Sequence, residues 1–444
     1  MKFPFLPRLD EHSRDMLRGA ALVFGMRATG SAMAFIFNVM LARKLGAEGA
    51  GVYFLAFTVV TIASVIGQLG LENAMMRFTA ASAAKQDWET IAGICRRGIH
   101  LSLLASGALS IGVFLAAPWI SNSLFNEPSL TTPLRYMALS IVPLSLLNLY
   151  AGLTKAVNRP GYGAFSQNFG MSLFNMLLLG GFYWMVSTVD QVAMMYVVSI
   201  TTVCIISIWL WRKAAPQLRG KRGDFDQRRL MDTSLPLLWV SSMYLVMSWT
   251  DTLMLGNMMG SEAVGLYSIP VRIAMLTSFV LIAVNSVAAP KFSVLHAQGE
   301  NIALATAAKR SANLMTIVAL PILVFFVFWP NTILGFFGEE FVSASTVLVI
   351  LSLGQFICVL SGNVSHLLAM TGHGRELRNI VCFSAVLNVI LNVLLISQFG
   401  ILGAAIATAT CMATMNAASA FVVYRRLSIN PLPNFLFLKA SVRI

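Results

Sequence analysis

The chain has 444 residues, of which 57% are hydrophobic and only 11% are charged, and its mean hydropathy is +0.76. Soluble globular domains use about 45–50% apolar and about 25% charged residues, so this composition excludes a soluble protein and predicts a polytopic membrane protein. The net charge of +13 does not indicate a nucleic-acid-binding protein, because the basic residues lie in short runs between apolar segments and not on a soluble domain.

The apolar segments, taken in chain order, predict an all-α protein. Each is close to the roughly 20 residues that a helix needs to cross the hydrocarbon core of a bilayer. We expect twelve transmembrane helices, at residues 17–42, 51–78, 91–117, 131–155, 162–187, 190–212, 233–256, 264–290, 311–337, 341–370, 377–399 and 401–424. The first segment is longer than the apolar core of a cleavable signal peptide, so it is expected to remain as a membrane anchor.

Basic residues are distributed very unequally between alternate loops. One set of loops and termini carries 26 of the 31 lysines and arginines, and the opposite set carries only Arg43 and Lys44. The remaining three, Arg27, Arg135 and Arg272, fall inside predicted helices. Because loops rich in Lys and Arg stay in the cytoplasm, we expect both termini to be cytoplasmic in a multi-pass protein of the cell inner membrane.

An internal duplication relates the two halves of the chain. The stretch LGAEGAGVY at Leu45–Tyr53 recurs as MGSEAVGLY at Met259–Tyr267, 214 positions later. Each copy lies between two apolar runs, so each predicts a tight hairpin in which glycine accepts backbone angles that other residues resist. Each unit holds six helices, an even number, so the copies are expected to be parallel repeats with a cavity between them.

These patterns divide the chain into two lobes and two polar segments. We expect an N-lobe at 1–213, a cytoplasmic basic linker at 214–231, a C-lobe at 232–426 and a cytoplasmic or interfacial tail at 427–444. The linker contains DFD, with Asp224 and Asp226, which has the form of a metal-binding glycosyltransferase motif. No nucleotide-binding domain surrounds it, so we interpret the linker as a determinant of orientation that contacts anionic lipid headgroups.

Charged residues inside the predicted helices are the candidates for function, because an arginine at mid-helix costs roughly 2.5–3.5 kcal/mol on insertion scales. Arg27 lies near the midplane and has no acidic neighbour three or four residues away. Arg272 follows Pro270, and Asp251 is the clearest acid within a helix; an ion pair between Arg272 and Asp251 is the structural alternative. Arg135 lies nearer a helix end, where its side chain reaches the interface as an alternative to binding.

Candidate binding residues are therefore Arg27, Arg272 and Arg135, with Asp251 as a candidate coupling residue. An arginine in a cavity suits a phosphate or pyrophosphate, which it meets with two parallel hydrogen bonds. Glu72 is interpreted as structural. Scattered cysteines and histidines, without CxxC or Cys/His spacing, predict no metal site, and no motif indicates a cofactor or a catalytic residue.

Three motifs carry a resemblance to a known family: ARKLGAEGAGVYFLAF, then GQLGLENAMMRFTA, then KQDWE. The chain resembles the polysaccharide-exporting flippases for O-antigen and exopolysaccharide, within the multidrug/oligosaccharidyl-lipid/polysaccharide (MOP) exporter superfamily. The resemblance implies a MATE-like fold of two six-helix lobes. In related flippases of lipid-linked peptidoglycan precursors, arginines on helices one and eight bind the pyrophosphate, and Arg27 and Arg272 occupy those helices here.

The resemblance further implies the function. We expect a flippase, not an enzyme, that moves an undecaprenyl-pyrophosphate-linked oligosaccharide from the cytoplasmic to the periplasmic leaflet by alternating access, driven by an ion gradient or the membrane potential. Its expected partners are this glycan, membrane lipids and a polysaccharide polymerase or export machinery, without nucleic acid. The alternatives are a cation-coupled multidrug antiporter on the same fold, and a membrane enzyme such as a polymerase or glycosyltransferase, which would need a larger extramembrane loop.

Overall fold

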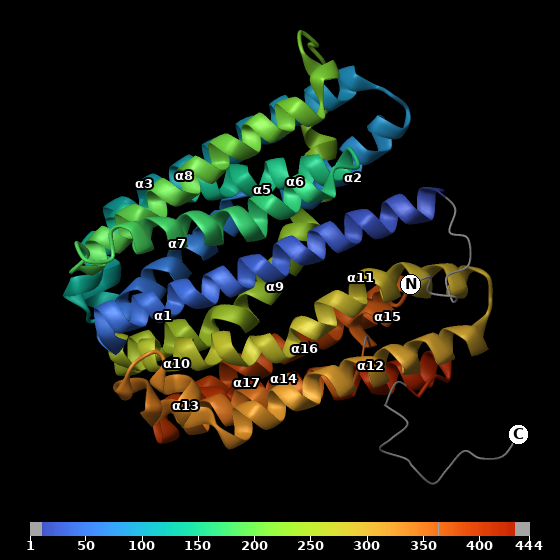
Figure 1. Ribbon diagram of the computed structural model, residues 1–444. Helices are drawn as coiled ribbons and strands as arrows, with labels where there is room; N and C mark the ends of the chain where they lie inside the picture. Colours follow the sequence, from blue (N-terminus) through green and yellow to red (C-terminus); the bar gives the residue numbers. More distant parts are fainter. Residues whose placement is uncertain (1–10, 363, 431–444) are drawn as a thin grey trace, which may run out of the picture.

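The computed structural model describes residues 11–362 and 364–430. This part of the chain contains helices and connecting loops and no strand. Figure 1 shows the helices of the first half of the chain in one layer and those of the second half in another, with α1 and α9 between them. The helices are α1 (Glu11–Gly67), α2 (Leu71–Ala84), α3 (Trp88–Trp119), α4 (Thr131–Ala138), α5 (Ile141–Ala156), α6 (Pro160–Ala164), α7 (Met171–Gly181), α8 (Val189–Ala214), α9 (Gln227–Met259), α10 (Ser261–Ala274), α11 (Phe279–Ala297), α12 (Asn301–Phe328), α13 (Pro330–Gly335), α14 (Ser345–Leu360), α15 (Val364–Met370), α16 (Gly374–Phe399) and α17 (Ile401–Leu427).

The chain is a multi-pass membrane protein, although its helices do not match the twelve predicted spans one to one. In the described ranges eight helices are long and apolar enough to cross a membrane, or nine if the pair Pro128–Ala138 and Ile141–Ala156, bent by 46°, counts as one. The span predicted at 17–42 and the first part of the span predicted at 51–78 run together through α1, and the second span continues into α2 after a break at 68–70. Two others, at 162–187 and 264–290, are divided by a π turn at Phe165–Gly170 and a 3₁₀ turn at Met275–Ser278.

Both predicted hairpins are present, and a glycine makes each turn. Gly46 interrupts α1 with φ 70° and ψ −176°, and Gly260 separates α9 from α10 with φ 85° and ψ −177°. Such positive φ values favour glycine because they strain residues that carry a Cβ atom. The two turns lie at the same end of the molecule, which we call the hairpin end; the opposite end, which contains the linker, is the linker end.

At the hairpin end the two duplicated stretches pack directly against each other. A Cβ atom on Gly51 would lie 1.7 Å from the Ser261 carbonyl oxygen, and one on Gly265 would lie 1.9 Å from the Ala47 carbonyl oxygen. These positions correspond to one another at the 214-residue offset, so the contact repeats about a local two-fold axis. The helices approach this closely because glycine has no side chain.

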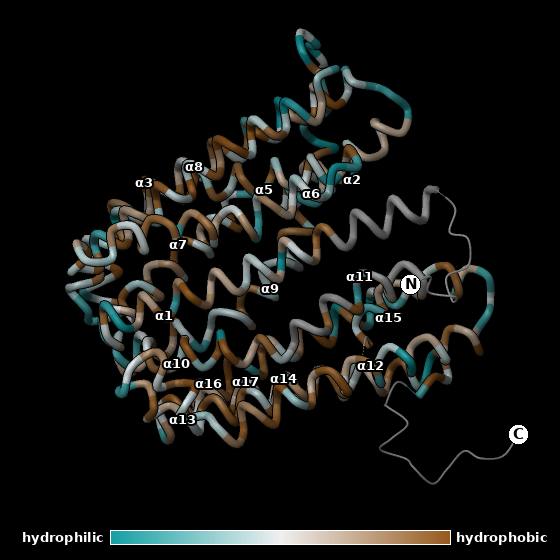
Figure 2. The backbone as a smooth tube through the Cα atoms, in the orientation of Figure 1, coloured by the Kyte–Doolittle hydropathy of each residue, from teal (hydrophilic) through white to brown (hydrophobic). Residues whose placement is uncertain are grey.

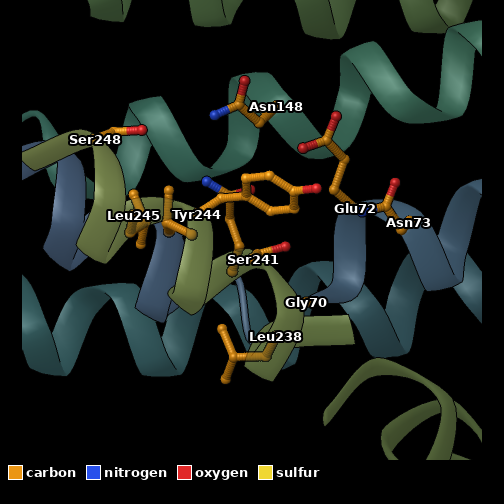
Figure 3. A pocket seen from close by; sticks show the side chains of 11 residues that line it. Gly70, Glu72, Asn73, Asn148, Leu238, Ser241, Tyr244, Leu245 and Ser248 are labelled. Carbon is orange, nitrogen blue, oxygen red and sulfur yellow. The ribbon is translucent and has the colours of Figure 1, made fainter. Parts of the chain in front are cut away.

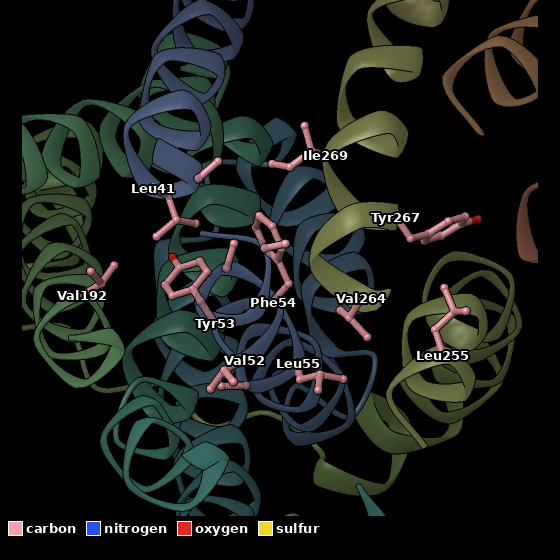
Figure 4. Packing of buried hydrophobic residues seen from close by; sticks show 14 of the residues in the cluster. Leu41, Val52, Tyr53, Phe54, Leu55, Val192, Leu255, Val264, Tyr267 and Ile269 are labelled. Atoms are coloured by element: carbon pink, nitrogen blue, oxygen red, sulfur yellow. The ribbon is translucent and has the colours of Figure 1, made fainter. Parts of the chain in front are cut away.

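Large side chains fill the space beside this glycine contact. Figure 4 shows Tyr53 and Phe54 of α1 with Val264 and Ile269 of α10, and all four are buried. Such a continuous apolar cluster between the two halves of the chain stabilises their contact at the hairpin end.

Polar contacts between the halves repeat with the same symmetry. The Ala47 backbone N–H donates to Glu340 Oε1 at 2.9 Å, and the Ser261 hydroxyl donates to Glu127 Oε2 at 2.6 Å. Each acid therefore binds the start of the helix that follows the hairpin in the opposite half. Carboxylates at helix N-termini accept hydrogen bonds from unpaired donors and interact favourably with the helix dipole. We call this pair of contacts the acidic latch.

The halves diverge away from the hairpin end. Figure 1 shows them closest at the hairpin end and separated toward the linker end, where the start of α1 lies between them. Figure 2 shows hydrophilic residues mainly in the loops of both ends and hydrophobic residues along the helices between them. The large exposed side chains on the helices, such as Leu115, Ile317 and Phe328, are the surface that lipid would cover.

The linker is attached to the first half of the chain. Asp224 accepts hydrogen bonds from Arg97 at 3.2 and 3.4 Å and from Arg96 at 3.5 Å, and Lys221 pairs with Glu89 at 3.0 Å. The hydrogen bond from Arg97 is the main cause that lowers the pKa of Asp224.

Both acids of the DFD motif thus have structural partners. Asp226 accepts from the Arg228 backbone N–H at 2.9 Å and caps the N-terminus of α9. The described residues contain no group of three or more His, Cys, Asp or Glu side chains placed to hold a metal. Asp224 and Asp226 thus bind the arginines of α3 and the start of α9, and the expected role of the linker in orientation and lipid contact stays a prediction. Most of the predicted tail, 431–444, lies outside the described residues.

Candidate functional site

Arg272 of α10 lines a cavity of about 150 Å³ whose other lining residues all belong to the first half of the chain. Its guanidinium carbon lies 4.3 Å from the centre of the Phe54 ring and 5.7 Å from that of Phe57. Its Nε is buried without a hydrogen-bond partner. Aromatic faces attract a cation without using its N–H donors, so the guanidinium keeps donors for an anion. The other lining residues are Ala34, Phe37, Asn38, Tyr53, Gln167, Asn168, Met171, Ser172, Asn175 and Tyr196.

Arg27 lies on the face of α1 that leads into this cavity. Ala34 and Asn38 follow it by seven and eleven residues, which is close to two and three helical turns, and both line the cavity. The rise per residue puts Arg27 about 10 Å from Ala34 and about 16 Å from Asn38 along the helix axis. Arg27 is partly exposed, and it forms no hydrogen bond or ion pair with any described residue. It does not belong to the lining of the cavity.

A chain of hydrogen bonds extends from the Arg272 cavity to a second one. Lys155 Nζ donates to Gln167 Oε1 at 2.5 Å, and Gln167 Nε2 donates to Glu72 Oε1 at 3.0 Å and Asn148 Oδ1 at 3.2 Å. Gln167 lines the first cavity, whereas Glu72 and Asn148 line the second. The opposite charge of Glu72 and the like charge of Arg27 both act on the Lys155 ammonium.

The second cavity has a volume of about 300 Å³ and lies between the first half of the chain and α9. In Figure 3 the Tyr244 side chain extends into the space between Asn148 and Glu72. Tyr244 is 45% exposed, so its ring is available to a ligand. We call this space the Glu72 cavity. It is lined by Val65, Gln68, Gly70, Glu72, Asn73, Asn148, Leu238, Ser241, Tyr244, Leu245 and Ser248.

An apolar groove of about 450 Å³ adjoins α1 on another face. Its walls carry almost only hydrocarbon groups, in contrast to the two cavities. Ala28, next to Arg27, lies at one edge of the groove. The groove is lined by Ala28, Ser31, Ala32, Phe35, Ile36, Leu276 and Ile322.

Asp251 lies in a polar cluster inside the second half of the chain. It is 4% exposed, and its Oδ2 accepts hydrogen bonds from the hydroxyls of Tyr267, at 2.6 Å, and Thr408. Its Oδ1 accepts from the amides of Asn392 at 2.7 Å and Asn388 at 3.5 Å. A buried carboxylate needs such donors, since an unpaired buried charge is costly.

The structure does not form the ion pair between Asp251 and Arg272 that the sequence left open. In the described part of the chain each group has other surroundings: hydroxyls and amides for Asp251, aromatic rings for Arg272. The amide oxygens Oδ1 of Asn388 and Asn392 remain buried without a hydrogen-bond partner. The cluster therefore presents a carboxylate and two free amide oxygens, which are ligands that a small cation or a proton-bearing group could use.

A family model described as polysaccharide biosynthesis protein matches residues 16–296, which is more than half of the chain. The chain belongs to the polysaccharide biosynthesis protein family. A second model, described as MatE, matches residues 236–394. Both assignments agree with the predicted MOP exporter superfamily.

The chain is also similar to proteins that are named as flippases or transporters. The chain is 26% identical over 408 residues to the probable low-salt glycan biosynthesis flippase Agl15 of Haloferax volcanii, covering 90% of this chain and 81% of that protein. Its fold is similar to the lipid II flippase MurJ in an inward closed conformation, with a TM-score of 0.74, 14% identity and coverage of 92% and 87%. An inward-facing MATE multidrug transporter gives a TM-score of 0.72, 16% identity and coverage of 95% and 100%. These two structural likenesses show the MATE-like fold.

In this member of the polysaccharide biosynthesis protein family, Arg135 is not brought to either cavity. It lies in the last turn of α4, exposed, with its guanidinium carbon 5.6 Å from the centre of the Phe114 ring. Neither Arg135 nor Phe114 lines either of the two cavities. Its guanidinium therefore lies against an aromatic ring of α3, and its expected role in binding or at the membrane interface stays a prediction.

Sequence reasoning missed several polar residues of the site. The sequence pattern indicates a structural role for Glu72, and the structure places it in the lining of a cavity; Lys155, at the end of a predicted helix, donates to Gln167. Gln167, Asn148 and Asn388 are uncharged and were not singled out. A search for Asn and Gln in apolar helices, such as the pair in LNVILN at 387–392, would have found part of this set.

Proposed function

We propose that the protein is a flippase that moves an undecaprenyl-pyrophosphate-linked oligosaccharide from the cytoplasmic to the periplasmic leaflet by alternating access. The observation that carries this proposal is Arg272, whose buried Nε has no hydrogen-bond partner and which lines a cavity walled mainly by the first half of the chain. Membership of the polysaccharide biosynthesis protein family and the names of its relatives support a lipid-linked glycan as the substrate.

Arg27 and Arg272 bind the pyrophosphate in this proposal, at two positions along the same path. Arg27 meets the headgroup first because it lies outside the cavity, nearer the start of α1, and Arg272 holds the headgroup inside the cavity. A guanidinium binds phosphate oxygens with two parallel hydrogen bonds, which strengthen where water is excluded. The polyprenyl chain lies along the apolar groove, whose edge at Ala28 is next to Arg27.

The orientation follows from the charge asymmetry of the loops. The linker end carries most of the basic residues, so we place it, with both chain termini, in the cytoplasm of a cell inner membrane. The hairpin end is then periplasmic, and the acidic latch closes that side. Transport requires the latch to open and the linker end to close. In alternating access the binding site then opens to the periplasm instead of the cytoplasm. The glycan released in the periplasm would pass to a polymerase or export machinery.

Asp251 is the proposed coupling residue. A monovalent cation or a proton would bind to its carboxylate and the free amide oxygens of Asn388 and Asn392. Tyr267, which donates to Asp251, lies on α10, the helix that also carries Arg272 and Gly265. Cation binding would therefore change the position of the helix that forms both the pyrophosphate site and the closed hairpin end.

A cation-coupled drug antiporter is the second candidate, favoured by the MatE model and the fold. Cationic drugs would be repelled by Arg27, Arg272 and Lys155. The charge of the site therefore favours an anionic headgroup over a cationic drug.

Reconstituted protein tests the proposal. Purified wild-type protein in liposomes should move a labelled undecaprenyl-pyrophosphate oligosaccharide between leaflets, and Arg272→Ala should reduce the rate at least tenfold. Arg272→Lys should restore only part of the rate, because an ammonium lacks the planar fork of donors. Arg135→Ala is the matched control and should transport at the wild-type rate. A wild-type rate in folded Arg272→Ala would contradict the proposal.

A further inference from the structure

We propose that the Glu72 cavity is the subsite that binds the glycan. It accepts uncharged, hydroxyl-rich sugars and rejects sugars that carry a carboxylate. The inference rests on the proposed function and adds the chemical class of the glycan. It names Glu72 and Tyr244 as the residues that determine this specificity.

The lining of the cavity matches the chemistry of a neutral sugar. Its polar residues are one carboxylate, three side-chain amides and three hydroxyls, and none of its lining residues is Lys, Arg or His. Amides and hydroxyls both donate and accept, as sugar hydroxyls do, and a carboxylate accepts from two hydroxyls at once. The half-exposed Tyr244 ring offers an apolar face for the C–H groups of a pyranose.

Glu72 supplies the charge that would exclude an acidic sugar. It lies in the first turn of α2, where the helix dipole favours a negative charge. In the described ranges no basic group lies within 4 Å of its carboxylate, and its hydrogen-bond partner is the neutral amide of Gln167. Lys155 interacts with Glu72 at longer range but does not line the cavity, because its ammonium is bound to Gln167. A uronate would meet a like charge here.

The position of the cavity fits the sugars nearest to the pyrophosphate. Gln167 lines the Arg272 cavity and bonds to Glu72 and Asn148 of the second cavity, so the two cavities share a polar wall. The volume of about 300 Å³ is at the lower end for small-molecule sites. It therefore suits a short sugar unit, not the whole oligosaccharide, while the pyrophosphate occupies the neighbouring cationic cavity.

Both halves of the chain contribute to the cavity. Glu72 and Asn148 come from α2 and α5, whereas Ser241, Tyr244 and Ser248 come from α9. Their spacing of three and four residues places the three α9 residues on one helix face. A bound sugar would therefore contact both halves, so that sugar identity would affect the movement of one half against the other.

Binding of three lipids to purified protein in nanodiscs tests the inference. The probes are undecaprenyl pyrophosphate without sugar, the same lipid with a neutral disaccharide, and the same lipid with a uronate as the first sugar. Wild-type protein should bind the neutral glycolipid at least tenfold more tightly than the uronate lipid. Glu72→Gln should bring this ratio close to one, because glutamine keeps the hydrogen bond from Gln167 and removes the charge.

Tyr244→Ala should weaken binding of the neutral glycolipid at least tenfold and leave the sugar-free lipid unchanged. Tyr244→Phe keeps the ring and should retain most of the affinity, which separates a binding role from a folding defect. Trp239→Ala is the matched control, since Trp239 is an exposed aromatic residue of α9 outside the cavity lining.

Two results would overturn the inference: an unchanged preference in folded Glu72→Gln, or equal weakening of sugar-free and glycosylated lipids by Tyr244→Ala. Failure of the proposed function is distinguishable, because it would show as unchanged binding of the sugar-free lipid in Arg272→Ala. In that case the ratio between the neutral and uronate lipids still decides the inference about the Glu72 cavity.

Discussion

Arg27 and Arg272, both inside predicted membrane helices, have different surroundings. Arg272 lies against the rings of Phe54 and Phe57, which attract its charge without using its donors, and its Nε is buried without a hydrogen-bond partner. Arg27 is partly exposed and has no partner in the described part of the chain. Since a charge inside a membrane is costly, both positions are easiest to explain by a substrate or solvent that meets them.

Arg27→Ala should reduce glycan export at least tenfold while abundance in the membrane stays normal or rises, because a costly charge has been removed. Arg27→Lys should restore export only partly. The measurement is export per folded molecule, with Arg135→Ala as the control. If export per molecule stays at the wild-type level in Arg27→Ala, this arginine does not bind the headgroup.

Asp251→Asn should leave the protein folded in the membrane but change how transport depends on cation and pH gradients. The substitution keeps the size of the side chain and removes the charge to which Tyr267 and Asn392 donate. Transport into liposomes is measured with a sodium gradient, a proton gradient and no gradient. Identical responses of Asp251→Asn and the parent would show that this carboxylate has no part in coupling.

At the scale of elements, the duplicated hairpin is both a turn and an interface. Gly46 and Gly260 make the turns, whereas Gly51 and Gly265 allow α1 and α10 to touch. The acidic latch adds one carboxylate contact from each half. Because the contacts occur in symmetric pairs, each should contribute similarly to the closed hairpin end.

Glu127→Gln and Glu340→Gln should each favour opening of the hairpin end, and the double variant should do so more strongly. Loss of one such hydrogen bond at about 1 kcal/mol corresponds to roughly a fivefold change in population. Opening is measured by maleimide labelling of Val264→Cys, a buried position, in a cysteine-free background. Glu262→Gln, an exposed acid on the same hairpin, is the control. Unchanged labelling in the double variant would show that the latch does not hold this end closed.

Asp224→Asn should expose the linker to trypsin, because Asp224 attaches it to Arg96 and Arg97 of α3. Its lowered pKa means that the attachment is complete above the ordinary aspartate value of about 3.9 and is lost only as the pH falls through the lower native value. Cleavage of wild-type linker should therefore not vary between pH 8 and pH 6. Asp232→Asn, an exposed acid nearby, is the control.

At the scale of the whole molecule, the halves are tied at one end and separated at the other. The symmetric contacts at the hairpin end and the divergence in Figure 1 describe one conformation of the MATE-like fold. Its sidedness is a prediction from the loop charges, and it determines which leaflet has access to the cavities.

Topology reporters test that sidedness. A reporter fused after Arg229 or at the C-terminus should be cytoplasmic, and one inserted at Glu127 or Glu262 should be periplasmic, as the excess of basic residues at the linker end requires. A periplasmic signal at Arg229 would reverse the assignment of the two ends.

The sequence by itself determined the features that depend on local pattern. Apolar length predicted the helices, and the structure places helix over every predicted span while dividing some of them at short irregular turns. The duplicated motif predicted both hairpins, because a turn with positive φ needs glycine at a particular position. The family resemblance was carried by the same local motifs, and the family model confirmed it.

Tertiary structure alone decided which side chains meet. Asp251 binds Asn392 and Thr408, more than 100 residues away, and not Arg272, which is closer in sequence. Glu72 lines a cavity and Arg135 does not, although both lie near the ends of predicted helices. Periodicity shows that a segment is a helix, but the rotation of a membrane helix depends on packing against distant neighbours when both its faces are apolar. Contacts between helices therefore required the assembled structure.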